Sequence, residues 1–153
     1  MMSQPTERDV IAPSMLRFTT MLALVVSVLV AVVPPALHFY YGLHYAEGSL
    51  AAEARLNSRL VSQIVGRNPQ MWQFETLRID EIIAFTDATM SKTLLNAEGG
   101  EVTRMGAAAL AWPTVTTAHP VYDSGAVAGR ILITQSLFAL AKTSALLFLV
   151  CAA

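Results

Sequence analysis

The chain has 153 residues, of which 54% are hydrophobic and only 14% are charged, and its net charge is −1. Ordinary soluble proteins carry about 25% charged residues, so the composition predicts apolar segments that a water-soluble fold does not need. The near-neutral charge, without a cluster of basic residues, gives no support to nucleic-acid binding. The one cysteine, Cys151, excludes an intrachain disulfide.

Residues 18–37 form an apolar segment, FTTMLALVVSVLVAVVPPAL, that contains no charged residue. At 1.5 Å per residue a helix of this length crosses a hydrocarbon core of about 30 Å, and the segment lacks the polar face of a soluble helix. It ends in two prolines and then the bulky group HFYY, which favours an uncleaved anchor over a secretory signal peptide. We predict a transmembrane helix at residues 16–37 and a flexible cytoplasmic tail at residues 1–15.

The basic residues around this helix predict its orientation. Arg17 borders the apolar segment and Arg8 lies further out, whereas the opposite flank has no Lys or Arg before Arg55. Because cytoplasmic flanks of membrane helices carry the excess of Lys and Arg, we expect the N-terminus in the cytoplasm. The central domain, residues 38–136, is then outside the cytoplasm.

Residues 43–66 are rich in Ala, Leu, Glu and Arg, and predict a helix. Leu43, Leu50, Asn57 and Ile64 recur at seven-residue spacing, which is typical of a helix that pairs with a second copy. An amphipathic helix that packs on its own domain explains the pattern equally well. The Asn68-Pro69 step ends this helix, since the residue before proline avoids the α region.

A second helix is predicted at residues 69–85, because Asn is a favoured cap and Pro is favoured at the first helical position. Its recurring apolar residues predict a core face with Trp72 as an anchor. The period then changes, and short runs rich in β-branched residues alternate with turn signals. They predict the strands 89–96, 101–105, 114–122 and 127–134. The fold class is therefore an α+β membrane protein with a small antiparallel sheet.

The last apolar segment is residues 143–153, TSALLFLVCAA, which extends back to residue 137 with Lys142 as its one charge. We predict a second transmembrane helix at residues 137–153, near the lower limit of about 17 residues for a span. The last predicted strand leads into it without a Gly- or Pro-rich linker, so a shift in the sheet is expected to move this helix. Since the apolar segment is cut off, we expect the chain to be a fragment of a longer protein.

The order of these elements resembles the N-terminal sensory region of bacterial transmembrane signalling proteins, chiefly sensor histidine kinases and diguanylate cyclases. The most specific part is the hairpin HPVYDSGAVAG at residues 119–129, which is similar to the closing hairpin of PAS-like extracytoplasmic sensor domains. The resemblance implies a homodimeric receptor in the bacterial inner membrane. Its PAS-like domain would be periplasmic, and its output domain would follow the second span.

Catalytic motifs are missing from the sequence, which predicts no enzyme activity, no catalytic residue and no cofactor for this stretch. His44 and Glu47 are the one plausible helical pair of metal ligands, and two ligands do not make a metal site. If a small molecule or envelope signal is sensed, alternation along the strands favours Arg104, His119 and Tyr122 as ligand-binding residues. Arg78 would join them from the second helix.

Three functions remain open at this point. The first is the input module of a sensor histidine kinase, which passes an extracytoplasmic signal across the membrane through paired helices. The second is the same role in a membrane diguanylate cyclase. The third is a non-enzymatic scaffold that assembles with envelope partners. All three predict contact with the lipid bilayer.

Overall fold

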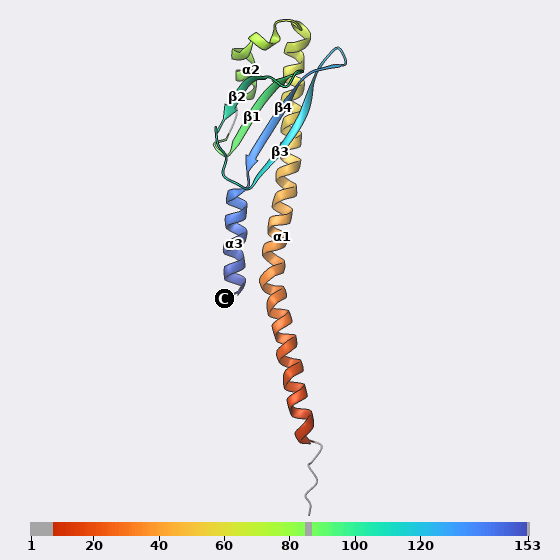
Figure 1. Ribbon diagram of the computed structural model, residues 1–153, viewed down its shortest axis with the longest axis vertical. Coiled ribbons are helices and arrows are strands. Elements are labelled where there is room, and N and C mark those ends of the chain that lie inside the picture. Colours follow the sequence, from red (N-terminus) through yellow and green to blue (C-terminus); the bar gives the residue numbers. More distant parts are fainter. Residues whose placement is uncertain (1–7, 85–86, 153) are drawn as a thin grey trace, which may run out of the picture. The chain divides into compact units, whose positions relative to one another are not determined.

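The computed structural model describes residues 8–84 and 87–152 and divides the chain into two compact units. The helical unit consists of Met1–Phe39 with Thr143–Ala153, and the sheet unit of Tyr40–Lys142. Two helices, α1 (Arg8–Arg67) and α3 (Phe138–Ala152), contribute residues to both units (Figure 1).

Helix α1 is long and apolar enough, in the part of the chain that the structure describes, to cross a membrane, and its apolar part lies near the N-terminus. Phe18 and Met21 are 70% and 74% exposed, which is not how the core helix of a soluble domain packs. Helix α3 is apolar but has 15 residues, fewer than the roughly 17 that a span needs. The second span therefore stays a prediction.

The helical unit also contains a polar contact between α1 and α3. The ring atom Nδ1 of His38 lies 2.9 Å from Oγ of Ser144, and Ser144 is buried. This hydrogen bond joins two residues that are far apart in the sequence. In an apolar environment such a bond holds helices together because neither group has water as an alternative partner.

The start of the chain differs from the prediction. Residues 8–15, which were predicted to belong to a flexible tail, are helical, and residues 1–7 of that tail lie outside the described residues. The helices predicted at 16–37 and 43–66 form one helix, α1, which continues through Pro34 and Pro35. Each proline removes one backbone donor, and α1 nevertheless stays helical on both sides of the pair. Its end at Arg67 confirms the predicted stop at Asn68-Pro69.

The C-terminal half of α1 packs on the sheet of its own unit. Leu50, Ala54, Val61, Ile64 and Val65 are buried in one hydrophobic core with residues of the strands. Asn57 is buried on the same side. The seven-residue stripe of the sequence is thus used within the chain, and the prediction that Leu50 and Asn57 form a seam with a second copy is wrong for these two residues.

The sheet has four strands, β1 (Met90–Asn96), β2 (Glu101–Gly106), β3 (Thr114–Asp123) and β4 (Ala126–Ser136), in the order β2-β1-β4-β3 (Figure 1). All neighbours are antiparallel, which confirms the predicted sheet. Ser124 and Gly125 connect β3 and β4 with positive φ angles of 47° and 91°. Two consecutive positive φ angles match the right-handed twist of the strands, so this two-residue turn sets the register of the hairpin.

The predicted helix 69–85 is broken. A 3-10 turn, η1 (Trp72–Phe74), precedes the shorter helix α2 (Thr76–Ile83), and Phe85 lies outside the described residues. Glu75 separates them at φ −83° and ψ 41°, which is not helical. The tight turn directs Trp72 into the core, where it is 2% exposed, so its predicted role as an anchor is confirmed.

An ion pair crosses the contact between α1 and the sheet. Lys92 lies on the central strand β1 and is 2% exposed, and its Nζ donates to Oε1 of Glu53 on α1 at 2.6 Å. A buried ammonium is costly unless its charge is paired and hydrogen-bonded. The pair therefore ties one position of α1 to one position of β1.

Replacing Glu53 by Ala should lower the free energy of unfolding by about 3 kcal/mol, because it removes the carboxylate partner of a buried ammonium. Thermal unfolding of the full chain in detergent, followed by circular dichroism, measures this loss. The control is the double variant E53L/K92M, which replaces both charges with apolar side chains and should recover most of the stability. A single variant as stable as the unmodified chain would contradict the structural role of the pair.

Candidate functional site

The sheet has two different faces. Residues on one face, among them Leu94, Val121, Ile131 and Ile133, are buried in the core with α1. Residues on the other face, such as Ser91, Thr93, Leu132 and Thr134, are only half-buried. Alternation of side chains along each strand separates the two sets.

The four predicted ligand-binding residues do not form one site. His119 and Tyr122 line the same groove beside α1. Arg104 pairs across the strands with Thr93 and therefore lies on the opposite, half-buried face. Arg78 is on α2, where it forms an ion pair with Glu75 at 3.8 Å. The structure thus brings two of the four residues together.

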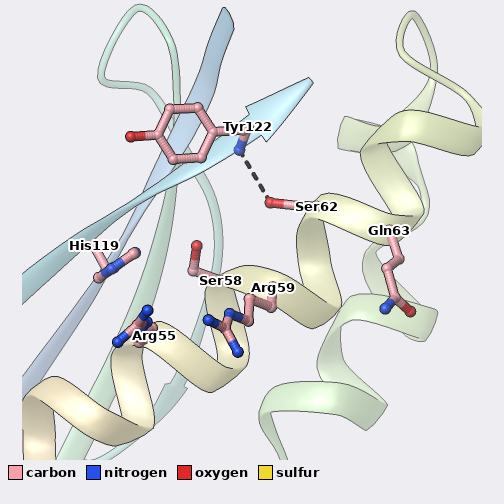
Figure 2. Close-up of a pocket in the computed structure, with 7 residues that line it drawn as sticks. All are labelled: Arg55, Ser58, Arg59, Ser62, Gln63, His119 and Tyr122. Carbon is pink, nitrogen blue, oxygen red and sulfur yellow. Dashed lines mark hydrogen bonds between the residues drawn. The ribbon is translucent and has the colours of Figure 1, made fainter. Parts of the chain in front are cut away.

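The groove that contains His119 and Tyr122 lies between α1 and the edge strand β3, and we call it the arginine groove. Its volume is about 650 Å³, within the range of about 300–1,000 Å³ that is usual for small-molecule sites. The helix contributes two arginines and three neutral polar residues, and the strand contributes an imidazole and a phenol. The lining residues are Arg55, Ser58, Arg59, Ser62, Gln63, His119 and Tyr122 (Figure 2).

Two serines of α1 fix the strand side of the groove. Ser58 Oγ donates to the backbone carbonyl of Pro120 at 2.5 Å. Ser62 Oγ accepts from the backbone N–H of Tyr122 at 3.0 Å (Figure 2). Since β3 is at the edge of the sheet, these backbone groups have no neighbouring strand. The serines satisfy them and at the same time protect the edge against pairing with another chain.

The charged residues that line the groove are arginines, with no acidic residue among them. Arg55 and Arg59 lie four residues apart on α1, and the lining contains no carboxylate. Among the described residues, no ion pair joins either arginine to an acidic side chain. Like charges at this spacing repel each other by about 0.2–0.5 kcal/mol. An anion between the two guanidinium groups would remove this repulsion.

Figure 2 shows how these side chains lie. The guanidinium groups of Arg55 and Arg59, the hydroxyl of Ser58 and the ring of His119 gather in one part of the groove. The hydroxyl of Tyr122 points away from the arginines, and Gln63 projects from another side of the helix. The polar centre of the groove is therefore formed by the arginines, Ser58 and His119.

The sequence analysis missed Arg55 and Arg59. The signal was present in the sequence. Two pairs of polar residues are each spaced by four, Arg55 with Arg59 and Ser58 with Ser62, and so they form one polar side of the helix. What the sequence alone does not contain is the position of β3 along this side. Without that position the two arginines resemble any solvated surface of a helix.

A smaller groove lies on the half-buried face of the sheet. It has a volume of about 380 Å³ and contains Arg104, Thr93, Leu132 and Thr134. Here the arginine has a partner within the same groove, since Nη2 of Arg104 donates to Oε2 of Glu101 at 2.5 Å. Its charge is already compensated, so this groove is less suited to an anionic ligand than the arginine groove.

The predicted pair of potential metal ligands is present as a hydrogen-bonded pair. Nδ1 of His44 lies 3.1 Å from Oε2 of Glu47, and the ring of Tyr40 packs against the imidazole at a centroid distance of 4.4 Å. Within residues 8–84 and 87–152, no group of three or more His, Cys, Asp or Glu side chains comes together as a metal site would require.

Comparisons of the chain with protein-family models, curated proteins and solved structures find no match.

Replacing Ser62 by Ala should make the backbone amide of Tyr122 exchange its hydrogen faster, by about threefold to tenfold, because the amide loses its side-chain acceptor. Hydrogen exchange of the full chain, read by mass spectrometry on the peptide that contains Tyr122, measures the change. The control is S49A, since the Ser49 hydroxyl bonds only within α1, to the carbonyl of Ala46. Equal exchange in both variants would mean that Ser62 does not protect the strand edge.

Proposed function

We propose that this chain is the sensory input module of a bacterial transmembrane receptor with a histidine kinase as its output. The sheet unit would be a PAS-like sensor outside the cytoplasm, and α1 and α3 would be the two membrane helices. The observation that carries this proposal is the direct passage from the sheet into α3. Strand β4 ends at Ser136 and α3 begins at Phe138, so one residue, Leu137, separates them.

The connecting residue is held firmly. Leu137 is buried, and its backbone N–H donates to the carbonyl of Pro113 at 2.7 Å. The hydroxyl of Ser136 donates to the carbonyl of Ala111 at 2.6 Å. A stiff connection transmits a displacement that a flexible Gly/Ser linker would absorb. This arrangement supports a role of β4 in passing a change in the sheet to α3.

Apolar residues around this connection support a membrane location for α3. Trp112 is 83% exposed and Phe138 is 53% exposed, and the segment before β3 reads AAALAWP. Large exposed aromatic residues are costly in water but are enriched at membrane interfaces. If α3 enters the bilayer at Phe138, the hydrogen bonds of Ser136 and Leu137 bring this segment to the lipid headgroups.

A homodimer is part of the proposal, with a different contact from the one predicted. Leu50 and Asn57 are buried in the chain's own core, so a second copy would meet the other side of α1. Tyr45 and Leu56 on that side are exposed at 80% and 58%, with the exposed Ala52 between them. Cysteine crosslinking between copies is therefore expected at Ala52 rather than at Leu50.

The topology can be tested with single cysteines at Gln4 and Glu98 in a C151S background. A membrane-impermeant maleimide added to intact bacteria should label the Glu98 position, because the sheet unit is expected outside the cytoplasm. The Gln4 position should react only after the cells are permeabilised. Labelling of both positions under the same condition would contradict a single crossing between them.

The coupling through β4 can be tested without knowing the stimulus. In a chimaera of residues 1–152 with the catalytic region of a histidine kinase, one to four alanines are inserted between Leu137 and Phe138. Each residue rotates the following helix by about 100°, so basal autophosphorylation should rise and fall with a period of about 3.6 residues. Radiolabelled ATP and membrane vesicles supply the measurement.

The matched control places the same alanines in the exposed turn between β1 and β2, after Glu98. Those insertions should leave autophosphorylation unchanged, because this turn leads only to the edge strand β2. A flat response to the insertions after Leu137 would exclude β4 as the route. It would leave the scaffold function as the better explanation.

A further inference from the structure

The arginine groove combines a cavity with an uncompensated charge. Arg55 and Arg59 place two positive charges on the helix side of the groove. The groove contains no acidic residue, and no carboxylate pairs with either arginine among the described residues. Arg78 and Arg104, by contrast, each have a carboxylate partner three residues away in the sequence.

The remaining polar groups of the groove suit an acceptor-rich ligand. Ser62 Oγ accepts from the Tyr122 amide, so its own hydrogen stays available to a ligand. His119 is half-buried beside the arginines, with its Nδ1 3.3 Å from the Pro120 carbonyl. The other ring nitrogen, Nε2, is a second hydrogen-bonding atom of the same side chain. The groove thus offers several donors around a positively charged centre.

From this arrangement we propose that the arginine groove binds a small organic dicarboxylate. The Cβ atoms of residues four apart on a helix are about 5–6 Å apart, so the two guanidinium groups are separate forks rather than one point charge. Each fork matches one carboxylate with two parallel hydrogen bonds. A volume of about 650 Å³ also exceeds what a single inorganic ion fills.

Because the groove lies between a helix and a strand, a bound ligand would contact both elements. The arginines belong to α1, whereas His119 and Tyr122 belong to β3, so a bound dicarboxylate bridges helix and strand. This inference deepens the proposed sensory function, because it names the class of molecule that is sensed. Binding itself does not depend on any signalling output, and it is measured on the full chain alone.

The experiment is isothermal titration calorimetry of the full chain in phosphatidylcholine nanodiscs, with succinate, acetate and inorganic phosphate as titrants. Succinate should bind saturably, with acetate and phosphate weaker by at least tenfold. The double variant R55Q/R59Q should weaken succinate binding by at least tenfold. R55K/R59K keeps both charges but loses the forks, and should lie between the two.

The matched control is R78Q/R104Q, which removes the same two charges outside the groove and should bind succinate within twofold of the unmodified chain. Circular dichroism shows whether each variant is folded. Absence of saturable succinate binding, tighter binding of phosphate, or equal loss in both glutamine variants would each overturn the inference. The sensory proposal is tested separately by the alanine insertions, so the two can fail independently.

Discussion

The sheet unit depends on how α1 is held against the strands, and the ion pair between Glu53 and Lys92 fixes that contact at one point. An apolar stripe alone allows a helix to slide or rotate, since hydrophobic contact has no direction. A buried ammonium on the central strand accepts only a helix position that brings a carboxylate within hydrogen-bond distance. With α1 in this position, Ser58 and Ser62 form hydrogen bonds to the backbone of β3. The arginine groove lies between α1 and β3.

The face of α1 toward the sheet is therefore not a simple apolar core. Asn57 and Ser58 of α1 and Lys92 of β1 are buried at this contact, and Nδ2 of Asn57 has no hydrogen-bond partner among the described residues. An unsatisfied buried donor costs about 1–3 kcal/mol. Polar groups at this contact reduce the stability that the same area would give if it were aliphatic. In exchange they define one register of helix against sheet.

The sequence predicted the four strands and the hairpin well, because period-two alternation and turn residues such as Ser124-Gly125 act locally. It failed where the outcome depends on distant contacts. The helices predicted at 16–37 and 43–66 are one continuous helix, α1. The break at Glu75 accompanies the burial of Trp72 in a core that the local sequence does not reveal. Arg104 and His119 were grouped because both lie on strands. Which face each occupies depends on the pairing order β2-β1-β4-β3, and a shift of one residue exchanges the faces.

The two walls of the arginine groove, α1 and β3, are each connected to an apolar helix. One wall belongs to α1, whose other half is the long apolar helix, and the other wall belongs to β3, which pairs along its length with β4. Strand β4 continues after one residue into α3. On the proposed function, a ligand between these walls changes output only if it binds one spacing of α1 and β3 more tightly than another. Because Ser58 and Ser62 bond to the same strand that the ligand would contact, a change in spacing must also alter these two hydrogen bonds. On the proposed function, the edge of β3 would therefore couple ligand binding to helix movement.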